Sequence, residues 1–154
     1  MARDMNIELK ELGIKCVSLY PGVVRTERMK GILDSGEWKS RTRLDTPAIF
    51  VESPQLTGKV ISQMYLNNDH ILEDIAGKVS ITAELAKKYN IKDPISNITP
   101  PSIRSIKFLL PSIVLGKLKF ENQKQREFIE NLIIKLSPDI LLPMKLMEGG
   151  APNQ

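Results

Sequence analysis

Residues 13–26 read GIKCVSLYPGVVRT, and this stretch decides which fold the chain is expected to adopt. The run from Ile14 to Tyr20 is apolar and β-branched enough for a strand, and its few polar members do not alternate cleanly. That pattern is typical of a parallel strand whose two faces are both covered. Pro21-Gly22 ends the strand, and Thr26 begins a polar segment with helical potential.

The segment before this strand is predicted to be a helix. Its apolar side chains recur at helical spacing on one face: Met1, Met5, Leu9 and Leu12. Gly13 stands where a left-handed C-terminal cap belongs. No Ser, Thr, Asp or Asn precedes the apolar face in a capping position, so the helix has a predicted end without a predicted start. Either the first turn is frayed, or the segment continues a longer helix.

A second strand–helix unit follows later in the chain. Ser53-Pro54 is a strong helix start, with an apolar face continuing to about Leu66. Residues 78–82 are predicted to form a short strand, and residues 83–89 a short helix. Two parallel strands need neighbours at both edges and helices on both faces. We therefore expect an α/β fold that is one part of a doubly wound parallel sheet, with about two strands retained.

The motif Pro21-Gly22-Val23-Val24-Arg25-Thr26 resembles the P-G-x-V-x-T that follows the sixth strand of the short-chain dehydrogenase/reductase (SDR) family. Residues 53–59 and 76–79 resemble the last core helix and the seventh strand of that family. The likeness covers about residues 1–93. It implies that 1–93 form the C-terminal part of a Rossmann-type domain and that 94–154 form a mainly helical extension.

The resemblance also implies a cofactor site in the loop after the strand. In the family, backbone groups around this loop meet the nicotinamide carboxamide, and the threonine bonds to the cofactor. The residues predicted to bind cofactor are therefore Pro21, Gly22, Val23, Val24 and Thr26. Ligands of open α/β sheets bind at the carboxyl ends of strands, and glycine lets backbone approach a flat ring. The alternative is that Pro21-Gly22 is only a turn and Thr26 only a helix cap.

The sequence lacks two other motifs of the family. No glycine-rich phosphate loop is present, and no Tyr-x-x-x-Lys occurs. The tyrosines Tyr20, Tyr65 and Tyr89 are followed at the fourth place by Val24, Asp69 and Asp93. We therefore predict no catalytic residue, no activity of this chain alone and no binding of NADP or NAD by it alone. A full-length parent would use NADP or NAD to reduce a carbonyl or oxidise an alcohol.

Composition excludes some classes of protein and of site. The chain contains one cysteine and one histidine, which predicts neither a disulfide nor a metal site and favours an intracellular location. Cys16 is expected inside the first strand, as part of the core. The net charge is +4, but the basic residues are scattered and aromatic residues make up only 5%. Nucleic acid is therefore not a predicted partner.

The segment 94–154 is expected to be helical in two places, with Pro111 interrupting the first and 121–136 forming the second. Three roles are open for it. It packs over the active site or sheet, seals a partner subunit, or lies on a membrane surface through residues 103–147. The resemblance to one branch of the family implies association with the endoplasmic reticulum membrane. The sequence predicts no oligomeric state.

Overall fold

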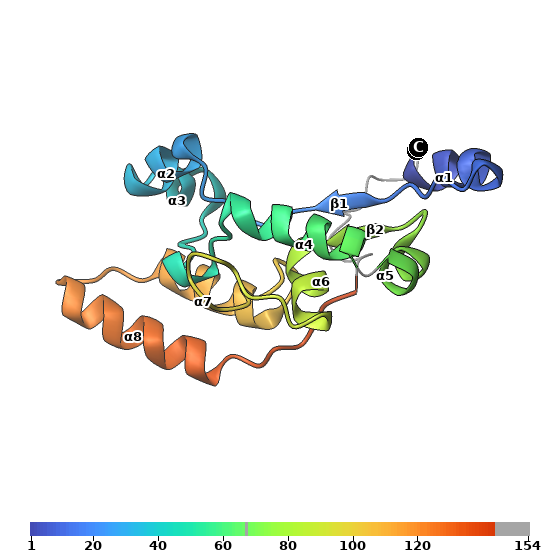
Figure 1. The fold of residues 1–154 in the computed structure, drawn as a ribbon. Coiled ribbons are helices and arrows are strands. Elements are labelled where there is room, and N and C mark those ends of the chain that lie inside the picture. Colours follow the sequence, from blue (N-terminus) through green and yellow to red (C-terminus); the bar gives the residue numbers. More distant parts are fainter. Residues whose placement is uncertain (67, 144–154) are drawn as a thin grey trace. The chain divides into compact units, whose positions relative to one another are not determined.

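The computed structural model describes residues 1–66 and 68–143, and its elements form two compact units (Figure 1). The first unit comprises Met1–Thr26 and Glu52–Pro100. The second comprises Glu27–Val51 and the described residues from Pro101 onward. This grouping places residues 27–51 in the same unit as the residues after 100. The domain boundary near residue 93 that the sequence suggested stays a prediction.

The first unit contains a parallel pair of strands, β1 (Ser18–Tyr20) and β2 (Val79–Ile81), with Leu19 opposite Ser80. The connection between them passes through residues 27–51, which belong to the second unit, and then through α4 (Pro54–Leu66) and α5 (Asn68–Ile75) of the first unit. Helix α6 (Thr82–Lys88) follows β2 directly. Two parallel strands joined through helices form a partial Rossmann-like α/β fold. The predicted fold class is therefore confirmed.

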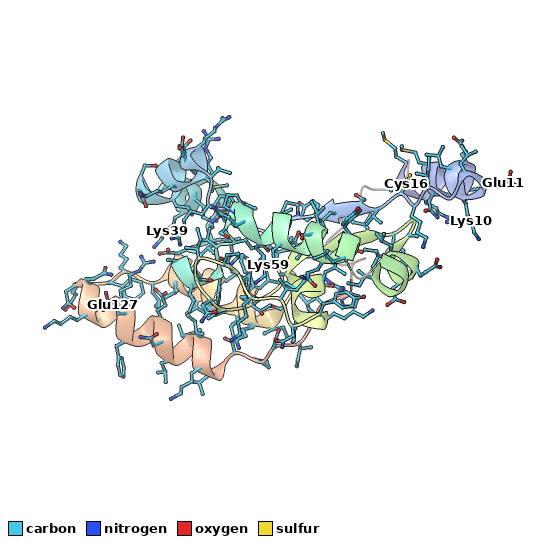
Figure 2. The ribbon with its side chains drawn as sticks, viewed as in Figure 1. Lys10, Glu11, Cys16, Lys39, Lys59 and Glu127 are labelled. Atoms are coloured by element: carbon cyan, nitrogen blue, oxygen red, sulfur yellow. The ribbon has the colours of Figure 1, made fainter. Side chains whose placement is uncertain are left out.

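The first strand is shorter than the sequence predicted. The strand was expected to begin at Ile14. β1 instead begins at Ser18, which lies opposite Val79, the first residue of the partner strand. Just before the partner strand, Gly77 adopts a left-handed φ of 72°, so the regular strand geometry stops there, although its N–H still donates to Cys16 O (2.8 Å). Cys16 consequently lies before β1 and is half-buried, so its predicted place inside the strand and core was wrong (Figure 2).

The N-terminal helical segment has the end that its sequence predicts. Helix α1 (Ala2–Leu9) continues as a 3₁₀ turn (Lys10–Leu12) and stops at Gly13, whose φ is 72°. The N–H of Gly13 donates to Lys10 O (3.0 Å), and the N–H of Ile14 donates to Leu9 O (3.2 Å). These two bonds define a Schellman motif. No residue of α1 is buried, so its apolar face is exposed within the described part of the chain.

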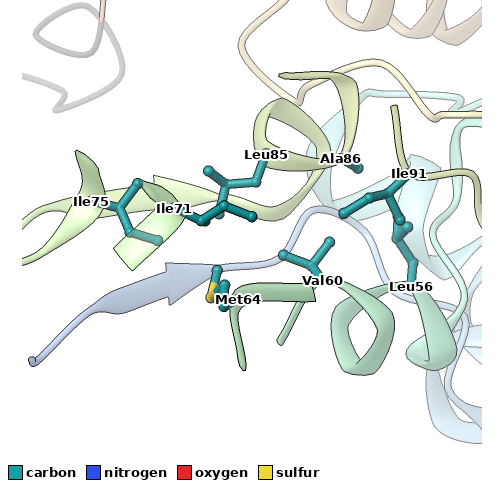
Figure 3. Packing of buried hydrophobic residues seen from close by; sticks show 8 residues of the cluster. All are labelled: Leu56, Val60, Met64, Ile71, Ile75, Leu85, Ala86 and Ile91. Carbon is teal, nitrogen blue, oxygen red and sulfur yellow. The ribbon is translucent and has the colours of Figure 1, made fainter. Parts of the chain in front are cut away.

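The core of the first unit lies between α4, α5 and α6 (Figure 3). It consists of Leu56, Val60, Met64, Ile71, Ile75, Leu85, Ala86 and Ile91. Ser53 caps α4 as predicted, since its Oγ accepts the N–H of Leu56 (3.3 Å). Helix α5 begins at Asn68, in a segment for which no helix was predicted. Its residues Ile71 and Ile75 pack into this core, which stabilises the helix.

The second unit is helical and has a core of its own. Its elements are α2 (Glu27–Asp34), α3 (Glu37–Thr42), a 3₁₀ turn (Ala48–Phe50), α7 (Ile106–Lys117) and α8 (Gln123–Leu136). The rings of Phe50 and Phe108 are 5.9 Å apart between centroids, and Leu115 is fully buried. Asp45 receives two hydrogen bonds from the guanidinium of Arg126 (2.7 and 2.9 Å).

Pro111 lies inside α7, so the predicted interruption of this helix was wrong. A proline at this position removes one backbone hydrogen bond, and its ring crowds the preceding turn. The ring is nevertheless fully buried, and burial of apolar surface offsets part of that cost. Ser105 provides a side-chain cap by accepting the N–H of Phe108 (3.1 Å). Tertiary packing therefore overrides the local preference.

Candidate functional site

The five residues predicted to bind cofactor lie in one loop, directly after the carboxyl end of β1. We refer to residues 21–26 as the Pro-Gly loop. Proline cannot continue the strand ladder, so the chain leaves the sheet at Pro21. Within the loop, Val23 is buried, Gly22 and Val24 are half-buried, and Pro21 and Thr26 are exposed. Their role in binding a cofactor stays a prediction.

Glu52, which stands just before α4, holds the Pro-Gly loop through its backbone and its side chain. Its N–H donates to Val23 O and its carbonyl accepts from Arg25 N, both at 2.8 Å. Its side-chain Oε1 accepts the N–H of Gly22 at 3.1 Å. Three hydrogen bonds thus join consecutive parts of the loop to a single residue, which restricts the loop to one arrangement.

This pairing determines which way the backbone of Val24 faces. Val24 and Glu52 form an isolated parallel bridge in which the neighbours of Val24 make the bonds to Glu52. The N–H and C=O of Val24 therefore face away from Glu52. Val24 O accepts the N–H of Thr26 (2.9 Å), and no hydrogen bond from the Val24 N–H is recorded among the described residues.

A carboxamide group fits this arrangement. It offers one acceptor oxygen and two N–H donors, which match an outward backbone N–H and a carbonyl oxygen that still has a second lone pair. The Pro-Gly loop thus has the donor and acceptor that binding of a nicotinamide carboxamide needs. A nicotinamide ring, when bound, would supply hydride transfer, and the residues of this loop would only orient the ring through its carboxamide.

The environment of Glu52 is unusual for a carboxyl group. The side chain is only 1% exposed, and Oε2 is buried without a hydrogen-bond partner among the described residues. Burial raises the pKa of Glu52 to about 7, against the lowering effect of the Gly22 N–H, and the negative charge of Asp93 adds to the rise. Near neutral pH, Glu52 therefore carries a proton in a large share of molecules.

Asp93 is also buried, yet its oxygens are fully used. Oδ2 accepts the N–H of Ser53 (2.7 Å), and Oδ1 accepts those of Ile95 (2.8 Å) and Ser96 (3.2 Å). Burial opposes ionisation, but these backbone hydrogen bonds outweigh it and lower the pKa of Asp93. Asp93 is therefore the charged member of this pair of carboxyl groups.

Neither Glu52 nor Asp93 was predicted as a site residue. One signal for Glu52 was available, because it stands between the apolar run Ile49–Val51 and the helix start at Ser53. The contact with the Pro-Gly loop joins residues about 30 positions apart. No local pattern predicts such a pairing.

Residues 1–66 and 68–143 contain no group of three or more histidine, cysteine, aspartate or glutamate side chains that could hold a metal ion. No helix in this part of the chain combines the length and the apolar character needed to cross a bilayer. The backbone N–H of Cys16 donates to Asn6 Oδ1 (3.0 Å).

A parallel strand pair, with a Pro-Gly loop at the carboxyl end of its first strand, forms a partial Rossmann-like α/β fold. Comparison with curated proteins adds the dehydrogenase/reductase class. The mouse protein named dehydrogenase/reductase SDR family member 1 is 32% identical over 96 residues, and its human counterpart is 31% identical over 101 residues. The chain is thus related to the SDR family.

The extent of this similarity is limited. The aligned part makes up 60% of this chain and spans 30% of the length of each of these two relatives. No family model matches the chain. A search of solved structures gave no match either.

Proposed function

We propose that this chain contributes the carboxamide-binding side of the cofactor pocket of an NAD(P)(H)-dependent short-chain dehydrogenase/reductase. The observation that carries the proposal is the Pro-Gly loop, anchored by Glu52 with the Val24 N–H facing away. In this proposal a longer parent protein reduces carbonyls or oxidises alcohols by hydride transfer. The tyrosine, lysine and glycine-rich loop of the family are absent from these 154 residues, so the chain alone is expected to be inactive.

Two exposed features support a parent with more strands. β1 and β2 pair only with each other in the described part of the chain, so each has one unpaired edge there. The apolar face of the N-terminal helical segment is open, with Met1 92% and Leu12 72% exposed. In the proposed parent, further strands and helices of the sheet would cover both features.

The chain itself offers a test. Titration of the purified protein with NADPH, followed by nucleotide fluorescence, should show no binding tighter than millimolar, because no phosphate-binding loop contributes affinity. Nicotinamide mononucleotide at millimolar concentration should shift the backbone amide NMR signals of Val24 and Thr26, while that of Lys78 stays in place. Micromolar affinity for NADPH would contradict the expected inactivity. Shifts confined to other regions would contradict the carboxamide site.

A second candidate function rests on helix α8. Phe128, Leu132 and Leu136 recur at four-residue spacing and are 70%, 47% and 74% exposed. We propose that this face lies on an anionic membrane surface, at the endoplasmic reticulum in an intracellular protein, as a non-catalytic interaction element. The described residues 103–143 contain seven lysines and arginines against four acidic residues, which suits anionic lipid. Residues 144–147 of the predicted membrane segment lie outside the described residues.

Flotation of the full chain with vesicles tests this second function. The protein should float with vesicles containing phosphatidylserine and remain behind with pure phosphatidylcholine vesicles. Replacing Phe128 by serine should reduce the bound fraction several-fold. Replacing Tyr65, which is 76% exposed on α4, by serine is the matched control and should leave binding unchanged. A chain that stays soluble with both vesicles would exclude this function.

A further inference from the structure

The carboxyl group of Glu52 is placed where only one of its oxygens is used. Oε1 accepts the Gly22 N–H, whereas Oε2 is buried and has no hydrogen-bond partner among the described residues. A carboxylate oxygen held this way leaves its negative charge unsolvated, which is costly in a protein interior. A protonated carboxyl avoids that charge while its other oxygen still accepts the N–H of Gly22.

The neighbouring Asp93 makes ionisation of Glu52 harder. Three backbone N–H groups hold Asp93 in its charged form, so a second negative charge at Glu52 would face the first. Arg25, whose backbone N–H binds Glu52, has an exposed side chain. Asp93 is a charged group that acts on Glu52 and raises its pKa.

We propose that Glu52 is a positioning residue for the Pro-Gly loop, and that its protonated carboxyl fixes the Gly22 N–H while its ionisation opens this loop to water. An ionised Oε2 must acquire a hydrogen-bond donor, and water is the donor that a small movement of the loop admits. The pKa of Glu52, about 7, places this change near neutral pH. Its relevance to a cofactor rests on the proposed function, since Gly22 belongs to the candidate cofactor loop.

The test needs no cofactor, so it can fail independently of the proposed function. The backbone amide of Gly22 is followed by NMR in the full chain from pH 5.5 to 8.5, recording its chemical shift and its protection from hydrogen exchange. In the unaltered protein, the shift should titrate with a midpoint near pH 7, and protection should fall at least several-fold across that range. Replacement E52Q keeps an acceptor for Gly22 but cannot ionise, so its Gly22 signal should stay constant.

Two further variants identify the group whose ionisation causes the titration of the Gly22 signal. The chain has one histidine, His70, whose ordinary pKa also lies near this range, so H70Q should titrate like the unaltered protein. D93N removes the neighbouring charge and should move the midpoint to lower pH. A Gly22 amide that does not titrate in the unaltered protein would overturn the proposal. So would a titration that persists in E52Q or disappears in H70Q.

Discussion

Replacing Glu52 by glutamine should change how the folding stability of this protein depends on pH. In the folded chain the pKa of Glu52 is raised from 4.5 to about 7, chiefly by burial. The folded state then binds the proton more tightly than the unfolded state does. The resulting stabilisation is fully present below pH 4.5 and is lost as the pH rises through about 7.

The size of the effect follows from the shift. A rise of about 2.5 units, at 1.36 kcal/mol per unit, corresponds to about 3 kcal/mol. The free energy of unfolding of the unaltered protein, measured relative to that of E52Q, should therefore decline by about 3 kcal/mol between pH 4.5 and 8. Titrating groups distant from Glu52 act equally on both proteins and cancel in this difference.

Urea unfolding followed by far-ultraviolet circular dichroism at several pH values provides the measurement. E11Q, at an exposed glutamate of the N-terminal helical segment, is the matched control, and its curve should keep the shape of the unaltered protein's curve. Parallel curves for the unaltered protein and E52Q would refute the reasoning. A rise with pH in the free energy of unfolding of the unaltered protein, relative to that of E52Q, would refute it as well.

Two other predictions concern the helices. A Cβ at Gly116 would lie 2.2 Å from the carbonyl oxygen of Arg43, so G116A should lower the melting temperature and cost about 1–3 kcal/mol. G58A is its matched control: that position in α4 is open, and alanine there should stabilise by about 0.5–1 kcal/mol, so equal effects of both changes would contradict the contact. D45N should cost about 1–3 kcal/mol in urea unfolding, because Arg126 loses two charge-assisted hydrogen bonds. In a protein that already carries R126Q, D45N should cost less. If D45N costs the same with and without Arg126, the two side chains are not coupled.

Much of the fold was predictable wherever local chemistry decides the conformation. Gly13 ends the first helical segment because glycine tolerates a left-handed φ, and Ser53 starts α4 because its hydroxyl satisfies a free N–H. The parallel strand pair followed from two short apolar runs bounded by turns. The placement of the five loop residues after a strand followed from Pro21-Gly22 in the same way.

Other features could not be predicted, because they depend on residues far apart in the sequence. The length of β1 is limited by the left-handed conformation of Gly77 just before the partner strand, and nothing near Ile14 indicates that limit. Pro111 is tolerated in α7 because its ring is buried, although its local preference is to end a helix.

The sequence by itself determined the class of fold, the caps, and the composition of the Pro-Gly loop, since these depend on backbone preferences and short-range hydrogen bonds. Tertiary structure alone decided how that loop is held. Glu52 meets Gly22 across 30 positions, and Asp93 meets Ser53 across 40. Burial of these two carboxyl groups sets their opposite protonation, because desolvation and the number of N–H donors are properties of the folded environment.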